Sequence, residues 1–547
     1  RVAEAITGAG VESVAISMLH AYANPAHERR TAELLREVAG DRLFVTCSAD
    51  ILPEIREYER TSTTVVNAYL GPVVAGYLGS LVDGLRRAGL TAPLRIMQSG
   101  GGLMSADAAI RKPAALLESG PSAGVVACAY LAGLTGTRDV ISLDMGGTTA
   151  KAAILENGRP VKTNEYEVGA GINLSSKLVT GGGYAVRLPF IDISEIGAGG
   201  GSIVAVDEFG IVKVGPRSAG SSPGPVCYGG GGRLATLTDT FVTLGYVNPD
   251  SLAGGTVRLD ADAARAALQE QVADPLGKPL LDAARGVFEI AVATMTRAVK
   301  AVTTYRGRDP RDFVLTCFGG NGPVTAAEIA RVLRIPRMIV PPVPGVFSAA
   351  GLLFSDVEHD LGRTSFLRGE ELSGPVLERD YAALEEEVRA SLLAEGHAPE
   401  RIELSRFAEM RYSGQAYELA VAVPPGAVDI GGLVTGFHAE HQRTYGHVAV
   451  SDPVDVVSVR VVARVASRRN GAFRAAEVDG GRTSRRAYFG REHGLLDVPV
   501  IARAELAGVT LRGPLFIDEY DATCVIPPGC RATLDALGNI DVVIEAS

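Results

Sequence analysis

Residues 142–151 read Ser142-Leu143-Asp144-Met145-Gly146-Gly147-Thr148-Thr149-Ala150-Lys151, a glycine-threonine turn between two apolar runs. The run at 139–141 predicts a buried strand that leads into the turn, and the run at 152–155 predicts the strand that returns. Adjacent glycines let backbone N–H groups approach a phosphate without a Cβ in the way, and the threonine hydroxyls add donors. The turn is typical both of a phosphate-binding loop and of an ordinary Gly-Gly hairpin.

A second glycine cluster, Cys317-Phe318-Gly319-Gly320-Asn321-Gly322-Pro323, favours the phosphate-binding interpretation. It follows an apolar run at 313–316 and precedes a helix expected at 326–333. Strand, glycine loop and helix in this order present backbone N–H groups at a helix N-terminus, where anions bind. The two elements together resemble the two-lobed ATPase fold of actin, Hsp70 and the sugar kinases, so the expected fold class is α/β.

Further motifs extend the resemblance from a shared fold to one protein family. They are Glu195-Ile196-Gly197-Ala198-Gly199-Gly200-Gly201-Ser202, the segments 214–220 and 223–229, Thr238-Asp239, Arg306-Gly307-Arg308-Asp309-Pro310-Arg311 and Arg411-Tyr412-Ser413-Gly414-Gln415. In this order and number they resemble the A-type subunit of the hydantoinase/oxoprolinase family. The resemblance runs nearly end to end, from Leu19-His20 to Pro527-Pro528-Gly529.

The resemblance implies a hydrolase that couples ATP hydrolysis to the opening of a cyclic amide such as hydantoin, N-methylhydantoin or 5-oxoproline. Phosphorylating the carbonyl oxygen converts a stable amide into a reactive electrophile, and the protein positions the phosphoryl group and neutralises its charge. The catalytic set then expected is Asp144, Thr148, Thr149 and Lys151, with Asp144 holding Mg²⁺. The expected cofactor-binding glycines and amide are Gly146, Gly147, Gly199, Gly200, Gly319, Gly320 and Asn321.

Two other functions stay open at this point. ATP-dependent ketone carboxylases of the acetone and acetophenone type use a similar chain, and nothing in the sequence separates a ketone from a cyclic amide. A non-catalytic nucleotide-binding scaffold is the third interpretation. The family resemblance also implies a B-type partner subunit and hence a hetero-oligomer.

Composition bounds these interpretations. The 547 residues carry a net charge of −10, which argues against a nucleic-acid-binding protein. The uncharged stretches at 119–137 and 338–354 are interrupted by proline and glycine, so we expect no membrane span there. The six cysteines are scattered without a C-x-x-C pair, which indicates reduced thiols and a cytoplasmic protein. Cys227, in a glycine-rich loop, is compatible with a nucleophile and more typical of a buried small side chain.

Several polar residues are further candidates. Arg217, Arg306 and Arg308 are compatible with carboxylate or phosphate contacts and equally with surface ion pairs. His438 and His441, three residues apart on an expected helix, suggest either a zinc site or, more commonly, a solvated helix face.

The residue pattern along the chain predicts three structural parts. Residues 1–60 alternate helix and strand and are expected to be the remainder of an N-terminal lobe, because family members begin with a further phosphate loop that this sequence does not show before Asp144. Residues 61–360 are expected to form the ATPase-like core, entered by a helix at 61–87. Alternating β-branched residues predict a β-rich C-terminal domain over 361–547.

Overall fold

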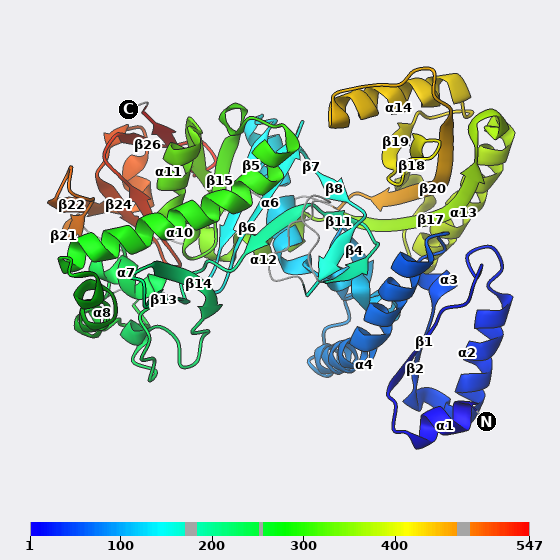
Figure 1. Cartoon of the computed structure of the whole chain (residues 1–547), viewed down its shortest axis with the longest axis horizontal. Coiled ribbons are helices and arrows are strands. Elements are labelled where there is room, and N and C mark those ends of the chain that lie inside the picture. The colour runs from blue at the N-terminus through cyan, green and yellow to red at the C-terminus, as the bar shows by residue number, and fades with distance from the viewer. Residues whose placement is uncertain (1, 170–182, 251–254, 468–481, 546–547) are drawn as a thin grey trace.

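The computed structural model describes residues 2–169, 183–250, 255–467 and 482–545. Figure 1 shows two bodies joined side by side: one holds the centre of the chain and its C-terminal end, and the other holds the N-terminal part and a second large sheet. The α/β character predicted from the sequence is confirmed by helices and strands that alternate through both bodies.

A nine-stranded sheet forms the core of the first body. Its order is β12 (Ile193–Ile196), β6 (Ala150–Glu156), β5 (Val140–Met145), β15 (Val314–Phe318), β16 (Arg337–Val340), β27 (Ile540–Ile544), β26 (Cys530–Leu534) and β23 (Leu511–Arg512), with β7 (Arg159–Pro160) beside β6. The strands β5, β15 and β16 are parallel, whereas β6 returns antiparallel to β5 as the turn at 146–149 predicts.

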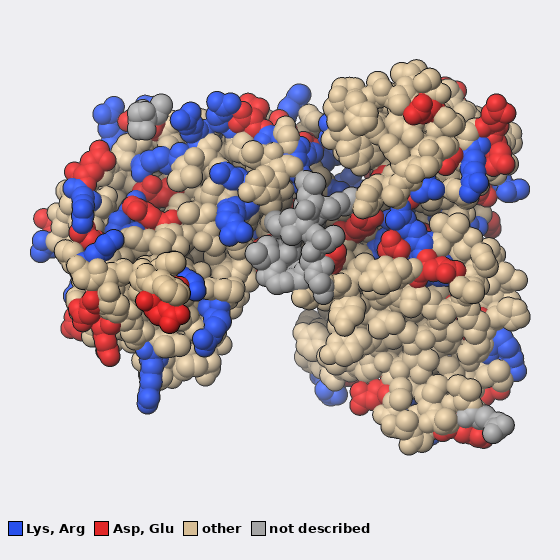
Figure 2. All heavy atoms as spheres, viewed as in Figure 1, with Lys and Arg blue, Asp and Glu red and all other residues tan. Residues whose placement is uncertain are grey.

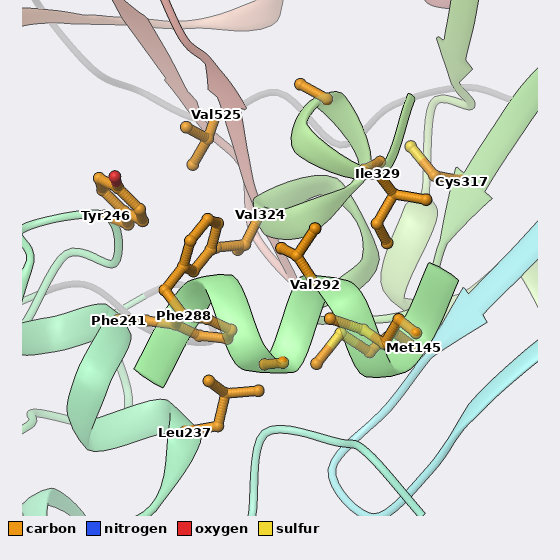
Figure 3. Packing of buried hydrophobic residues seen from close by; sticks show 14 of the residues in the cluster. Met145, Leu237, Phe241, Tyr246, Phe288, Val292, Cys317, Val324, Ile329 and Val525 are labelled. Carbon is orange, nitrogen blue, oxygen red and sulfur yellow. The ribbon is translucent and has the colours of Figure 1, made fainter. Parts of the chain in front are cut away.

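Helices cover both faces of this sheet. On β5 the side chains of Ile141, Leu143 and Met145 join the cluster that contains helices α10 (Leu280–Val302) and α11 (Gly322–Leu333). Figure 3 shows Phe288 and Val292 of α10 beside Val324 of α11 and Met145 of β5. Val140, on the other face, joins the cluster of α6 (Ser119–Thr135) and α12 (Phe347–Gly351). Apolar residues therefore stand on both faces of β5, because both faces are covered by helices.

Helices α6 (Ser119–Thr135) and α12 (Phe347–Gly351) approach each other closely. A Cβ added to Gly351 would lie 2.0 Å from the carbonyl oxygen of Ala123, and one added to Gly124 would lie 2.7 Å from Ser348 Oγ. The small residues of the segment 119–124 thus allow close packing of α6 on α12.

The second body contains a six-stranded sheet and the N-terminal part. The sheet order is β19 (Leu419–Val423), β18 (Ile402–Tyr412), β20 (Val454–Val465), β17 (Val357–Leu367), β4 (Leu103–Ser105) and β3 (Arg95–Met97). Helices α13 (Gly374–Ala394) and α14 (Ile430–Tyr445) pack against it. On α13 the buried side chains recur every three to four residues, from Leu377 to Leu392, which is the period of one helix face.

The N-terminal part runs α1 (Val2–Gly8), β1 (Ser13–Ile16), α2 (Ala26–Ala39), β2 (Phe44–Cys47), α3 (Ser48–Ile51) and α4 (Glu57–Arg87), and β1 pairs with β2 in parallel. The alternation and the long helix agree with the sequence prediction. Glu28, fully buried on α2, holds this part together because its carboxylate accepts from Ser48 Oγ at 2.6 Å and from the amides of Met18 and Ala49.

The strand-rich segment after residue 361 contributes to more than one sheet. Its first part belongs to the six-stranded sheet, and β26 and β27 complete the nine-stranded one. Strands β21 (Thr483–Tyr488), β22 (Leu495–Ile501), β24 (Leu515–Asp518) and β25 (Thr523–Ile526) form a four-stranded sheet of their own. The β-rich character is as expected from the sequence, while the domain boundaries stay a prediction.

Candidate nucleotide site

The hairpin of β5 and β6 presents the glycine-threonine turn at the edge of the core. Asp144 pairs with Lys151 and Met145 with Ala150, and the amide of Gly146 donates to the carbonyl of Thr149 at 3.1 Å. A Cβ added to Gly146 or Gly147 would meet no protein atom within 4 Å. The glycines therefore leave open space in front of the turn, a space that a ligand can enter.

The second glycine cluster lies directly beside this turn. Because β15 runs parallel to β5, Phe318 stands next to Asp144 and the loop that follows is held against the turn. Asn321 donates its backbone amide to Met145 O at 3.0 Å and its side-chain amide to Gly146 O at 3.2 Å. Gly319 has φ +79°, and a Cβ there would lie 2.4 Å from Met145 O. Only glycine fits this approach.

The loop after β12 completes the constellation. The amide of Gly200 donates to Gly146 O at 3.1 Å, and that of Gly201 donates to Gly147 O at 2.6 Å. A Cβ on Gly199 would lie 2.5 Å from the carbonyl carbon of Thr148. Three loops that are far apart in the sequence thus meet around the turn 146–149, and the structure brings together all of the glycines proposed for the cofactor.

Polar groups at the turn are available for a ligand. Thr148 is exposed and Thr149 half-buried, and within the described part of the chain neither hydroxyl makes a hydrogen bond. The two hydroxyls and the amide of Gly147 are donors of the kind that bind a phosphate, whereas the amide of Gly146 is already bonded to Thr149 O.

Asp144 is the carboxylate at this site. Burial raises its pKa above the ordinary value, while a hydrogen bond from Ser348 Oγ at 3.2 Å and the charge of Lys151 oppose the shift. No group of three or more His, Cys, Asp or Glu residues that can hold a metal is found among the described residues. A single carboxylate fits Mg²⁺, which keeps several waters and takes the rest of its ligands from phosphate oxygens.

Lys151 is placed differently from the expected phosphate contact. Its Nζ lies 3.2 Å from Glu118 Oε2 and 3.4 Å from Glu195 Oε1. Glu118 in turn accepts from the hydroxyl of Tyr166 at 3.0 Å and has φ +58°, a left-handed conformation that a residue with a side chain rarely adopts. Two carboxylates therefore lie within ion-pair distance of the Lys151 ammonium, and its contact with a phosphate stays a prediction.

The sequence did not single out Glu118 or Ser348. Glu118 immediately precedes α6, and Ser348 lies in α12. Neither carries a sequence pattern of its own, because long-range contacts bring them to the site: Tyr166 and Lys151 contact Glu118, and Ser348 donates to Asp144.

Of the remaining arginine candidates, two are paired with carboxylates and the third is exposed. Arg306 pairs with Asp192, and Arg308 binds Glu156 with Nε at 2.5 Å and Nη2 at 2.9 Å. Arg217 is exposed on β14 (Val212–Ser218).

Cys227 is buried, and burial raises the pKa of its thiol, as expected for a packed cysteine rather than a nucleophile. His441 is buried with Nδ1 2.8 Å from the carbonyl of His447, and no metal cluster involves it within the described ranges.

Family models of the hydantoinase/oxoprolinase proteins match three segments of the chain. The N-terminal region model matches residues 1–39, the hydantoinase/oxoprolinase model residues 60–361, and the C-terminal domain model residues 370–540. The matched segments together include all three loops of the site.

Individual relatives match over nearly the whole chain. An uncharacterized protein of Methanocaldococcus jannaschii is 39% identical over 99% of this chain and 78% of its own length, and the alpha subunit of caprolactamase from Pseudomonas jessenii is 33% identical over 96% and 75%. 5-Oxoprolinase 1 of Arabidopsis thaliana is 30% identical over 98% of this chain, which spans 42% of that protein.

Solved structures agree with the sequence matches. The ATP-dependent caprolactamase of Pseudomonas jessenii superposes with a TM-score of 0.83 and 31% identity, covering 99% of this chain and 78% of that one. The nucleotide-free acetone carboxylase superposes with a TM-score of 0.77 and 26% identity over the same shares. The chain therefore belongs to the hydantoinase/oxoprolinase family, as an A-type subunit.

Proposed function

We propose that the chain is the nucleotide-binding subunit of an enzyme that opens a cyclic amide through a phosphorylated intermediate, using ATP and Mg²⁺. The observation that carries this is the turn at 146–149, against whose backbone the loops at 199–201 and 319–321 pack. A Cβ on Gly146 or Gly147 would meet open space there, and among the described residues the hydroxyls of Thr148 and Thr149 make no hydrogen bond. An ATPase fold of the actin, Hsp70 and sugar-kinase type accounts for this arrangement of a hairpin turn beside a strand-glycine-helix element.

The residues of the turn define what the chain does in such a reaction. Backbone N–H groups and the hydroxyls of Thr148 and Thr149 bind the phosphate oxygens and spread their negative charge. Asp144, which accepts a hydrogen bond from Ser348 Oγ, would hold Mg²⁺ directly or through water, and the ion would neutralise charge on the phosphates. The oxygen of the substrate's amide attacks the terminal phosphorus of ATP, and the bond from that phosphorus to the leaving ADP breaks. Water then attacks the carbon of the activated carbonyl group.

The substrate class follows from the relatives. A caprolactamase and several 5-oxoprolinases act on cyclic amides by their names, and the caprolactamase is described as ATP-dependent. We extend this chemistry to the present chain and place it in the cytoplasm, where its described cysteines, all free and buried, stay reduced.

A B-type partner subunit is part of the proposal, because the caprolactamase and acetone carboxylase relatives are themselves named as subunits. Helix α4 offers a surface for it. Val65, Tyr69, Val73 and Tyr77, spaced four residues apart, are 50%, 79%, 74% and 66% exposed and form what we call the α4 stripe. Such a row of exposed large apolar side chains is typical of an interface.

The same helix has the length and apolar composition of a membrane span, with a mean hydropathy of 1.5 over its best window and 22% of that window buried. The face of α4 opposite the stripe indicates that the helix packs against the rest of the folded protein. It buries Arg60, Thr63, Thr64 and Asn67, and Asn67 donates to Thr46 Oγ1 and to the carbonyl of Arg111. The polar face packs into the protein, which leaves the stripe for a protein partner.

The test is ATP hydrolysis by the chain co-expressed with its B-type subunit, in the presence of caprolactam, hydantoin, N-methylhydantoin or 5-oxoproline. Substrate-dependent release of ADP together with a ring-opened product supports the proposal. Release of neither with any cyclic amide contradicts it.

The second candidate is a subunit of an ATP-dependent ketone carboxylase. The specific observation in its favour is the superposition on acetone carboxylase over 99% of the chain. Incorporation of labelled bicarbonate in the presence of acetone or acetophenone distinguishes the two reactions. Nucleotide binding without turnover of a cyclic amide or a ketone would favour the third function, a non-catalytic nucleotide-binding scaffold.

A further inference from the structure

A row of charged side chains lies at the foot of the turn 146–149. Asp144 stands directly opposite Lys151 in the β5–β6 pair, and Lys151 stands opposite Glu195 in the β6–β12 pair. Residues directly opposite each other in antiparallel strands point to the same face of the sheet. Glu118, which immediately precedes α6, reaches this face, and its Oε2 lies 3.2 Å from Lys151 Nζ. We call these four residues the charged row.

The charged row carries more negative than positive charge. It has three carboxylates and one ammonium, an excess of two negative charges when all four groups are ionised. The side chains of Glu118, Lys151 and Glu195 are only 18%, 20% and 22% exposed, so salt screens them less than it screens surface charges. On the face that Figure 2 shows, acidic and basic side chains are interspersed over the first body. A mixed surface of this kind adds little net field, so the row dominates the charge beside the turn.

Glu118 is held in place by several contacts. Its Oε1 accepts from the hydroxyl of Tyr166 at 3.0 Å, and its backbone carbonyl accepts from the amide and the hydroxyl of Ser122, at 3.1 and 2.9 Å. These contacts support the left-handed backbone at φ +58°, a conformation that costs free energy and that clusters at functional sites. The fold therefore specifies where this carboxylate lies, between Tyr166 and Lys151.

We propose that the Glu118–Lys151 ion pair sets the magnesium requirement of the nucleotide site, with Glu118 as the positioning residue. Glu118 and Glu195 share the ammonium, which is then not free to pair with a phosphate, and the excess carboxylate charge repels free nucleotide. The Mg²⁺ complex carries less negative charge, and the same carboxylates attract its cation. The inference rests on the proposed nucleotide site and adds what selects the form in which the nucleotide binds.

The test is calorimetric titration of the chain with a non-hydrolysable ATP analogue, once with excess Mg²⁺ and once with EDTA. The measured quantity is the ratio of the dissociation constant in EDTA to that in Mg²⁺. Glu118→Gln removes one negative charge and releases Lys151, so the ratio should fall. Free analogue should bind this variant at least about threefold more tightly than wild type, the order expected for a unit charge about 10 Å from a phosphate.

Lys151→Met should change the ratio in the opposite direction, because the row then loses its ammonium. Free analogue should bind at least about threefold more weakly, and the ratio should rise. Glu118→Asp keeps the charge and is tolerated in a left-handed backbone, so it should retain the wild-type ratio. A purely structural role of Glu118 would instead weaken binding equally with and without Mg²⁺, which would contradict the proposal.

Glu385 and Arg406 are the matched control pair, on α13 and β18 of the second body. Glu385 Oε1 lies 2.6 Å from Arg406 Nε, and its side chain is 22% exposed, close to the value for Glu118. Glu385→Gln and Arg406→Met should leave the ratio at the wild-type value.

The proposal is overturned by an unchanged ratio in both Glu118→Gln and Lys151→Met, or by a shift of the two in the same direction. Wild type that binds the analogue equally with and without Mg²⁺ would also overturn it, while leaving the nucleotide site itself in place. Wild type that binds the analogue under neither condition would contradict the nucleotide site and this inference with it, so the two failures are distinct.

Discussion

The side-chain amide of Asn321 donates to the carbonyl oxygen of Gly146 across 3.2 Å, and this bond joins two glycine clusters that are 175 positions apart in the chain. The same carbonyl accepts the amide of Gly200 at 3.1 Å. One backbone oxygen of the turn is therefore the meeting point of the loops after β12 and β15. The turn is positioned by tertiary contacts, and its free face is left to the ligand.

Gly199 tests the packing of the loops. In Gly199→Ala the new Cβ must displace the backbone of Thr148, so we expect destabilisation of about 1–3 kcal/mol and weaker nucleotide binding. Urea unfolding and titration with a non-hydrolysable ATP analogue measure the two effects. Gly320→Ala, whose Cβ would meet its nearest neighbour at an ordinary 3.6 Å, is the stability control. Wild-type stability in Gly199→Ala would show that the loop at 199–201 does not pack closely against the turn at 146–149.

Asp144 sets a pH dependence. Because burial raises its pKa, the carboxyl takes up its proton at a higher pH than an ordinary aspartate, whose pKa is 3.8. A protonated Asp144 would no longer hold Mg²⁺ at the proposed site. Mg²⁺-dependent binding of the ATP analogue should therefore fall on acidification above that value. Asp144→Asn should weaken the Mg²⁺ dependence and flatten the profile. An unchanged Mg²⁺ dependence in the variant would remove Asp144 from the metal site.

His359, on β17, gives a stability prediction. Its Nε2 lies 3.2 Å from Glu395 Oε1, yet burial outweighs that carboxylate and lowers the pKa of the imidazole below its usual 6.5. The unfolded chain binds the proton more readily, so the stabilisation is present above pH 6.5 and is lost as pH falls through the folded-state pKa.

Urea midpoints at about pH 7.5 and about pH 5.5 measure this effect, because the interval spans the histidine titration. Wild type should lose stability on acidification, and His359→Gln should lose less. An equal loss in both proteins would assign the acid sensitivity to other groups.

The loops of the candidate site could be predicted from the sequence because their glycines and threonines lie in short local patterns. The hairpin at 142–155 and the strand-loop-helix at 314–333 each carry their own signal of apolar run and turn. The joining of β26 and β27 to β16 has no local signature. Nor has the pairing of Lys151 with Glu118, because Glu118 reaches it only through the packing of α6. Long-range pairing of this kind depends on the whole core rather than on any segment.

The α4 stripe predicts the partner surface. Tyr69→Glu places a charge in the middle of the uncharged row and should abolish co-purification with the B-type subunit, without lowering the thermal midpoint of the chain alone. Phe209→Glu is the matched control, since Phe209 is 79% exposed, like Tyr69, but lies in the turn between β13 (Ser202–Val206) and β14. Undisturbed assembly with Tyr69→Glu would place the interface elsewhere.

The central claim is that the open space in front of Gly146 and Gly147 holds the phosphates of ATP. The most direct test is calorimetric titration of a non-hydrolysable ATP analogue with Mg²⁺ into wild type, Gly147→Ala and the control Gly120→Ala. Both added methyl groups meet no protein atom within 4 Å, so both variants should keep the stability of wild type to within about 1 kcal/mol. The account predicts that Gly147→Ala loses affinity at least about tenfold, by displacing the phosphate from the backbone donors, while Gly120→Ala binds as wild type does. Equal affinity in all three proteins would contradict it.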